Sequence, residues 1–210
     1  YNISNFVKLK ILSLYCTYVS DLSCIDTLIN LTYLNLNNCT NINTNTNIKY
    51  FNNISYCRNI TRLELKYCKI KDIDFLENLT KLEILYLSNT YIDNLNIFYY
   101  LKNLKILYLT FCINIIDFTP LKYCTNLYEL SLAFCKIKNL NVLDNLHNLK
   151  ILNLSYCHNI IDFSPLDKFN YNLIYLNVNN TNISSLSNLD NIPKIDRNWC
   201  FKLPAIKLIN

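Results

Sequence analysis

One phrase recurs along the whole chain and constrains its fold more than any other feature. Its form is Leu-x-x-Leu-x-Leu, followed by two residues and then Cys or Thr. A period of 22 to 29 residues predicts a solenoid, in which each unit buries its apolar face against its neighbours. Eight copies begin at Leu9, Leu31, Ile60, Leu82, Leu104, Leu127, Leu149 and Leu173, and a degraded ninth is expected from Ile195.

The spacing within one unit predicts a strand followed by a return segment. In the copy that begins at Leu82, Leu85 and Leu87 alternate with outward residues, which is the period of a strand. Apolar residues then follow at every third position from Ile92 to Leu104, which indicates coil or short helical turns on the opposite side. Stacked units of this kind place their strands in one parallel sheet.

Turn chemistry adds detail to the return segments. Thr119-Pro120 and Ser164-Pro165 place a hydroxyl before a proline, which predicts a short helix capped by that hydroxyl. Gly is absent from the chain, so we expect Asn to take left-handed turn positions. The 29-residue step contains a surplus of polar residues at 42–47, which is either a tolerated surface loop or a binding element.

The phrase and its period resemble the leucine-rich repeat family over residues 9 to about 195. This resemblance implies an α/β fold, with a parallel sheet on the concave face and short helical, 3₁₀ or coil returns on the convex face. The repeat length and the pattern of Ile70-Lys71-Asp72-Ile73 resemble internalins and phosphatase regulators. Cys at the ninth position resembles the longer repeats of F-box proteins.

We expect a single domain over residues 1–210. Its eight repeats would run from about residue 9 to 194, with a C-terminal cap at 195–210. Because the chain starts at Tyr1 and contains no Met, we also expect it to be a fragment of a longer protein.

The cysteines are predicted to be structural. In the leucine-rich repeat family the ninth position forms an inward-facing ladder, and adjacent rungs about 4.8 Å apart with parallel side chains are poorly placed for disulfides. Unpaired buried thiols favour a reducing compartment, so we expect a cytoplasmic protein, in the host cell if the source is a virus. Sequons such as Asn30-Leu31-Thr32 keep a secreted or surface location open. The ladder cysteines are Cys39, Cys68, Cys112, Cys135 and Cys157.

No pattern of residues indicates catalysis, a cofactor or a metal site. The chain has two histidines, His147 and His158, and no Cys-x-x-Cys pair, and without Gly it has no phosphate-binding loop. The aspartates at 21, 72, 117 and 162 recur at one repeat position, which predicts turn caps. We therefore expect a protein that is not an enzyme.

Charge and hydropathy exclude two classes of partner. The net charge of +5 is spread along the repeats, and the longest basic cluster is residues 66–71, so we expect no nucleic-acid binding. No apolar run reaches the ~18–20 residues of a membrane helix, so we expect no membrane partner. The wealth of Asn, Ile, Lys and Tyr fits an AT-rich genome, and we expect a monomer.

The outward side chains of the strands form the candidate site. They are aromatic and aliphatic in the middle of the array and rich in Asn at its ends, a layout typical of protein-binding hot spots. At the eighth repeat position, packing of the aromatic ring on the strand edge is the alternative. The candidate partner-binding residues are Tyr67, Ile84, Tyr86, Ile106, Tyr108, Phe111, Phe134 and Tyr156.

The sequence therefore predicts a protein–protein interaction module that binds a partner protein through its concave face. An intracellular adaptor or scaffold, or the substrate-recognition part of a ubiquitin ligase, fits the cysteine ladder. An internalin-like surface adhesin and a regulatory subunit of an enzyme such as a phosphatase are the alternatives, and both fit the repeat length.

Overall fold

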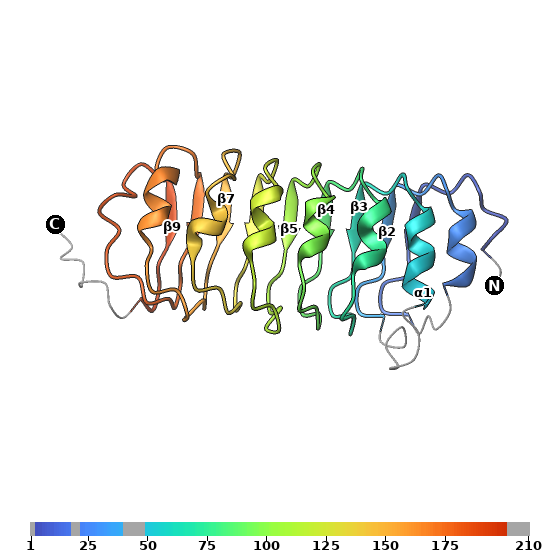
Figure 1. Cartoon of the computed structure of the whole chain (residues 1–210), viewed down its shortest axis with the longest axis horizontal. Helices are drawn as coiled ribbons and strands as arrows, with labels where there is room; N and C mark the ends of the chain where they lie inside the picture. The colour runs from blue at the N-terminus through green and yellow to red at the C-terminus, as the bar shows by residue number, and fades with distance from the viewer. Residues whose placement is uncertain (1–2, 18–21, 40–48, 201–210) are drawn as a thin grey trace.

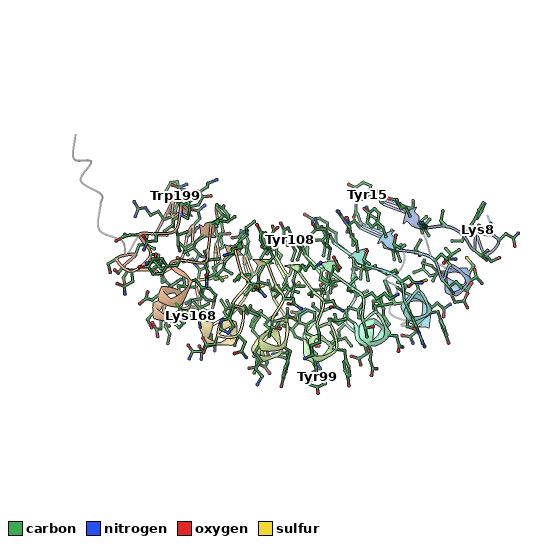
Figure 2. All side chains as sticks on the ribbon, turned by 90° about the horizontal axis from the view of Figure 1, so that it is seen from above. Lys8, Tyr15, Tyr99, Tyr108, Lys168 and Trp199 are labelled. Carbon is green, nitrogen blue, oxygen red and sulfur yellow. The ribbon has the colours of Figure 1, made fainter. Side chains whose placement is uncertain are left out.

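The computed structural model describes residues 3–17, 22–39 and 49–200. These residues form an elongated, curved row, with one sheet along the concave side and short helices along the convex side (Figures 1 and 2). Nine described strands lie side by side in chain order, and each runs parallel to the next. They are β1 (Ile11–Ser13), β2 (Tyr33–Asn35), β3 (Arg62–Glu64), β4 (Ile84–Tyr86), β5 (Ile106–Tyr108), β6 (Glu129–Ser131), β7 (Ile151–Asn153), β8 (Tyr175–Asn177) and β9 (Lys194–Asp196).

Each strand pairs with the next at the same repeat position. Leu85 lies opposite Leu107 and Tyr86 opposite Tyr108, for example. The 29-residue step does not disturb this register, since Leu34 still lies opposite Leu63. The expected α/β solenoid with a parallel concave sheet is thus confirmed. The surplus residues 42–47 lie outside the described residues.

Short 3₁₀ helices form the convex side in each of the first seven repeats. Their apolar residues recur every third position, which suits three residues per turn. Pro120 and Pro165 lie in the first turns of η6 and η8, as expected. The helices are η1 (Ser23–Thr27), η3 (Asn53–Tyr56) after the four-residue helix α1 (Lys49–Asn52), η4 (Asp74–Asn78), η5 (Asn96–Tyr99), η6 (Thr119–Tyr123), η7 (Leu140–Leu143) and η8 (Ser164–Phe169).

The caps of these helices differ from the expected hydroxyls. Asp117 accepts a hydrogen bond from the backbone N–H of Thr119, and Asp162 accepts one from the N–H of Ser164, at 2.8 and 2.9 Å. The Ser164 hydroxyl donates to Asp162 instead of capping the helix. The aspartates are therefore the turn caps, as their recurrence predicted, and Asn94 and Asn139 make the same bond in other repeats. Asp72 does the same, and Asp21 lies outside the described residues.

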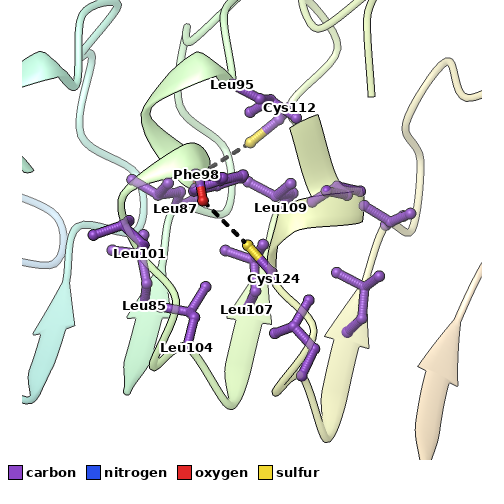
Figure 3. Packing of buried hydrophobic residues seen from close by; sticks show 14 of the residues in the cluster. Leu85, Leu87, Leu95, Phe98, Leu101, Leu104, Leu107, Leu109, Cys112 and Cys124 are labelled. Carbon is purple, nitrogen blue, oxygen red and sulfur yellow. Dashed lines mark hydrogen bonds between the residues drawn. The ribbon is translucent and has the colours of Figure 1, made fainter. Parts of the chain in front are cut away.

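The core runs unbroken between the sheet and the helices. The strand leucines and the apolar residues of the returns form one buried cluster. Figure 3 shows Phe98 of η5 between Leu87 and Leu109, with Leu85 and Leu107 on the neighbouring strands. Because each repeat covers the next, truncating one such side chain to Ala is expected to cost about 2–5 kcal/mol.

The ninth-position cysteines form the predicted ladder. Each buried thiol donates to the sixth-position carbonyl of the preceding repeat, as from Cys112 to Leu87 and from Cys135 to Leu109, both at 3.1 Å. Threonine rungs differ, because Thr90 donates to the same Leu87 carbonyl of its own repeat, at 2.7 Å. Every cysteine of the chain lies in the described residues, and none of them forms a disulfide.

The residue before each rung adopts a left-handed conformation. Its φ lies between 53° and 62° in all nine described copies, where the chain turns away from the sheet. Asn takes this corner in three copies, as its tolerance of this region predicts. Aromatic residues take it in five others, which the sequence did not indicate. The corner residues are Cys16, Asn38, Tyr67, Asn89, Phe111, Phe134, Tyr156, Asn180 and Trp199.

The ninth copy begins at Ile192, and the expected start at Ile195 is wrong. Ile195 lies opposite Leu176, which places it at the fourth repeat position. Cys200 then falls on the ladder, and its thiol donates to the Val178 carbonyl at 3.0 Å. Residues 194–200 therefore continue the solenoid instead of forming a separate cap, and residues 201–210 lie outside the described residues. The eighth repeat is only 19 residues long, and its described return has turns and no helix.

A second ladder joins several repeats at the corner before the strand, in five of the described copies. The Asn that precedes the first Leu donates its side-chain amide to a backbone carbonyl of the preceding repeat. These bonds are 2.8 to 3.2 Å long and use a residue that the phrase itself does not include. The Asn rungs are Asn30, Asn59, Asn103, Asn126 and Asn148.

Candidate interaction surface on the concave face

The eight residues predicted to contact a partner fall into two groups on the structure. Ile84, Tyr86, Ile106 and Tyr108 project from β4 and β5 and form what we term the strand cluster. The other four occupy the left-handed corner at the end of their strands. Figure 2 shows Tyr108 on the concave side, opposite Tyr99 on the convex side.

The strand cluster is a compact patch of four half-buried side chains. The in-register pairing places Ile84 beside Ile106 and Tyr86 beside Tyr108. The two tyrosine rings meet edge to face, with centroids 4.8 Å apart and an interplanar angle of 69°. Such ring pairs are favoured over face-to-face contact and hold both rings in one geometry.

Two cations from β3 and the residues after it cover these rings, and the sequence prediction missed both. The Lys66 ammonium lies 4.0 Å from the ring centroid of Tyr86 and 5.6 Å from that of Tyr108. The Arg62 guanidinium lies 5.0 Å from the ring centroid of Tyr33 and 5.5 Å from that of Tyr86. Both cations are within the range of cation–π attraction.

A buried carboxylate anchors this arrangement. Glu64 is only 5% exposed and accepts hydrogen bonds from Arg62, from the Tyr33 hydroxyl at 3.0 Å and from the Asn37 side chain at 2.6 Å. Burial alone would raise the pKa of Glu64, but these donors together hold that pKa below its ordinary value. The carboxylate therefore stays charged and fixes Arg62 in place.

A second carboxylate fixes the other end of the strand cluster. The Tyr108 hydroxyl donates a hydrogen bond to Glu129, the outward residue that begins β6. Burial and this bond raise the pKa of Tyr108 above its ordinary value, so the hydroxyl remains a donor. The aromatic patch on β4 and β5 is thus held between Glu64 on β3 and Glu129 on β6, the strands that flank it.

Three of the corner residues stack face to face. The ring centroids of Phe111 and Phe134 are 3.9 Å apart, and those of Phe134 and Tyr156 are 4.1 Å apart, with interplanar angles of 14° and 9°. We term these three residues the corner stack. Because the corner repeats identically in adjacent repeats, aromatic residues there are forced into this spacing. Phe111 is 45% exposed, whereas Phe134 and Tyr156 are half-buried.

Tyr67 is a corner residue but belongs to neither the strand cluster nor the corner stack. Its corner neighbours are Asn38 and Asn89, which carry no ring, and it makes no ring contact with another described aromatic side chain. Its side chain is 57% exposed. The structure therefore unites seven of the eight predicted residues in two clusters, and their binding role stays a prediction.

The described residues offer few groups for other chemistry. Among them, no three His, Cys, Asp or Glu side chains are close enough together to hold a metal ion. His147 and His158 are both exposed, and His158 contacts the ring of Tyr156 edge-on. In the same described part of the chain, no helix has the length and apolar character needed to cross a membrane.

Comparison with known proteins supports the repeat assignment. A family model described as leucine-rich repeats, in two copies, matches residues 58–100. No curated protein sequence matches the chain significantly.

Solved structures with the same fold include two internalins of Listeria monocytogenes. Internalin InlF is 25% identical, covers 95% of this chain and 67% of its own, and superposes with a TM-score of 0.73. Internalin C2 is 27% identical over 92% of this chain and 76% of its own, with a TM-score of 0.62.

A leucine-rich repeat protein of Leptospira interrogans shares the fold at 20% identity, over 93% of this chain and 56% of its own, with a TM-score of 0.71. The family model, the neighbours and the nine-stranded parallel sheet agree. The chain is a leucine-rich repeat protein, built on a fold that generally serves as a non-catalytic module for binding other proteins.

Proposed function

We propose that this chain is a non-catalytic adaptor or recognition module that binds a partner protein through the strand cluster and the corner stack. The observation that carries the proposal is the Tyr86–Tyr108 pair, half-exposed at the middle of the concave face and fixed by Lys66, Arg62 and Glu129. Tyr and Arg dominate the hot spots of protein interfaces.

Rigidity strengthens the proposal on energetic grounds. Ordering a flexible side chain at an interface costs about 0.5–1.5 kcal/mol, and side chains that are already fixed avoid that cost. Each tyrosine of the pair contacts the other ring and the Lys66 ammonium before any partner arrives. The corner stack likewise offers a flat aromatic surface whose rings are already aligned.

The test compares two double variants that each lose two tyrosines. Tyr86→Ala/Tyr108→Ala removes the strand cluster rings, and Tyr56→Ala/Tyr91→Ala removes two exposed rings elsewhere on the surface. Tagged proteins, matched in circular dichroism and melting temperature, are used to capture partners from the source-cell lysate. Captured proteins are then purified and titrated against each variant.

We expect one partner to bind the unaltered chain and the control variant equally and to lose at least about tenfold in affinity for Tyr86→Ala/Tyr108→Ala. Equal binding of that partner to both variants would contradict the concave assignment.

The cellular setting is a second part of the proposal. We propose a reducing compartment, because the ladder thiols donate to backbone carbonyls and their oxidation would remove those bonds. Burial raises the pKa of Cys68, Cys124 and Cys157 to about 12, so these thiols are inert at neutral pH.

An internalin-like surface adhesin is the second candidate, favoured by the likeness to the two internalins. The two candidates differ in location, so the oxidation state of the cysteines separates them. Alkylation of the protein in its native cells, followed by mass spectrometry, is expected to find all ten thiols free. Disulfides in the native protein would favour the adhesin.

A further inference from the structure

A second tyrosine cluster lies on the convex side, away from the concave surface described above. Tyr99 ends η5 and Tyr123 ends η6, and their ring centroids are 5.2 Å apart at an interplanar angle of 80°. Tyr100 contacts Tyr99 edge-on, also at 5.2 Å. Figure 2 shows Tyr99 projecting from the convex edge. We term Tyr99, Tyr100, Lys102, Lys122 and Tyr123 the convex cluster.

Lysines complete the convex cluster. The Lys102 ammonium lies 4.5 Å from the ring centroid of Tyr99 and 4.7 Å from that of Tyr123. The Lys122 ammonium lies 5.1 Å from the ring of Tyr123. Lys102 is therefore held over two rings, with its N–H donors directed by the protein and still open to solvent.

These two lysines form no ion pair with a described carboxylate, although the charge of Lys122, after the hydrogen bonds from Thr119, contributes to lowering the pKa of Asp117. Lys71, Lys105 and Lys168 each form an ion pair with an acidic side chain, whereas Lys102 and Lys122 have no described carboxylate within 4.0 Å. The tyrosine hydroxyls of the two faces also differ in whether they donate to a carboxylate. On the concave face, Tyr33, Tyr108 and Tyr175 donate to Glu64, Glu129 and Asp196. Tyr99, Tyr100 and Tyr123 donate to no carboxylate in the described structure.

Acidic residues bound the convex cluster along the solenoid. One position of the return carries Glu77, Tyr99, Lys122, Asp144 and Lys168 in five successive repeats, and Asp144 pairs with Lys168. The cationic part is therefore about two repeats wide, or roughly 10 Å at the spacing of neighbouring strands. A long polyanion or a flat anionic membrane would meet Glu77 on one side, and on the other side Asp144, which is already paired with Lys168.

We propose that the convex cluster binds a short acidic segment of a protein partner. Carboxylates of the segment would pair with Lys102 and Lys122, and the tyrosine hydroxyls would donate to them. Charge complementarity selects the ligand, since neither lysine has a described carboxylate within 4.0 Å and the three tyrosine hydroxyls donate to none. This surface is separate from the concave face, so it gives the module a second, independent contact.

The test measures binding of a fluorescein-labelled glutamate-rich peptide by fluorescence anisotropy. A peptide with Gln in place of every Glu reports binding that does not need charge. The variant Lys102→Gln/Lys122→Gln removes both cations, and Lys136→Gln/Lys138→Gln removes two exposed lysines elsewhere with the same loss of charge. All four lysines lie at the surface, so the fold is expected to be unchanged.

We expect the acidic peptide to bind and the Gln peptide not to bind. Loss of Lys102 and Lys122 should weaken binding at least about fivefold, the effect of two exposed ion pairs, while the control variant changes it less than about twofold. Tyr99→Ala/Tyr123→Ala, which keeps the cations but removes their support, should also weaken it.

Three results would overturn the proposal. Equal weakening by the two lysine variants would show a general charge effect, and equal affinity for both peptides would show that carboxylates are not recognised. Stronger Lys102-dependent binding to single-stranded RNA or to phosphatidylserine vesicles would assign the surface to another class of partner. Because Tyr86 and Tyr108 are intact throughout, none of these outcomes bears on the concave face.

Discussion

The concave and convex faces each carry a pair of tyrosine rings beneath a lysine, but the charges around the two pairs differ. On each face, two tyrosines from adjacent repeats meet edge to face, and one lysine ammonium lies over both rings. On the concave face, Glu64 and Glu129 tie this pair down, whereas the convex pair has no such carboxylates among the described residues. The parallel register of adjacent repeats is therefore enough to bring two tyrosine rings together on either face. The neighbouring charges make the difference: carboxylates hold the concave pair in a neutral, rigid patch, and without a paired carboxylate the convex pair stays in a cationic one.

The largest effect is expected in the core that both faces share. Phe98 lies directly before Tyr99 and behind the strands that carry Tyr86 and Tyr108 (Figure 3). Phe98→Ala should lower the free energy of unfolding by about 3–5 kcal/mol, because it leaves a cavity in a close-packed site. Urea titration followed by circular dichroism measures this, and Tyr91→Ala at the surface serves as the control. A loss below about 1 kcal/mol would show that the two faces do not depend on this core.

A smaller loss of stability is expected from substituting Glu64, the buried carboxylate of the concave face. Glu64→Gln should cost about 1–3 kcal/mol, because it leaves Arg62 and its neighbouring donors without a charged acceptor. No substitution in the convex cluster removes a buried charge, so Lys102→Gln should stay within about 0.5 kcal/mol. Parallel urea titrations of the two variants measure the difference, and equal losses would remove the proposed distinction.

The Glu64 carboxylate also makes the free energy of unfolding depend on pH. Its pKa in the folded protein is below the ordinary value of about 4.3 that it takes when unfolded. The stability it contributes is therefore complete above that ordinary value and is lost as pH falls through the lower folded value. Acid titrations of the unfolding free energy should show this loss in the unaltered chain. The Glu64→Gln curve should be flatter in that range, and identical slopes would contradict a depressed pKa.

The smallest difference in stability is expected between two variants that each lose one tyrosine hydroxyl. Tyr108→Phe removes the bond to Glu129 and should cost about 1 kcal/mol. Tyr99→Phe removes a hydroxyl that donates to no described carboxylate and should change the unfolding free energy by less than about 0.5 kcal/mol. Thermal melts of the two variants test this pair directly, and the reverse order would mean that the carboxylate contact is not stabilising.

How far the sequence predicts this molecule depends on whether a feature repeats. The strand register, the core and the cysteine rungs follow from leucines that recur at fixed positions. Contacts between unlike positions, such as Lys66 on Tyr86, do not recur and need the lateral alignment of two repeats. Aligning each repeat with the next and comparing the charges at neighbouring positions places Lys66 and Arg62 beside the tyrosines.

The error at the C-terminal end has a related cause. Ile192 and Ile195 both suit the first position of the phrase, and only Ile195 preserves the 22-residue step. Cys200 distinguishes these two starts, because it falls on the rung only if the copy begins at Ile192. The aromatic corners were missed for a different reason. A left-handed conformation at Phe111 or Phe134 opposes local preference and is imposed by the stacking of repeats.

Hydroxyl-radical footprinting of the chain, alone and with its captured partner, tests the central claim most directly, because tyrosines on both faces report in one experiment. The account predicts that Tyr86, Tyr108 and the corner stack lose reactivity in the complex, while Tyr56 and Tyr91 do not change. Protection confined to the convex side, with Tyr86 and Tyr108 as reactive as in the free chain, would contradict the claim that the concave face is the partner-binding surface.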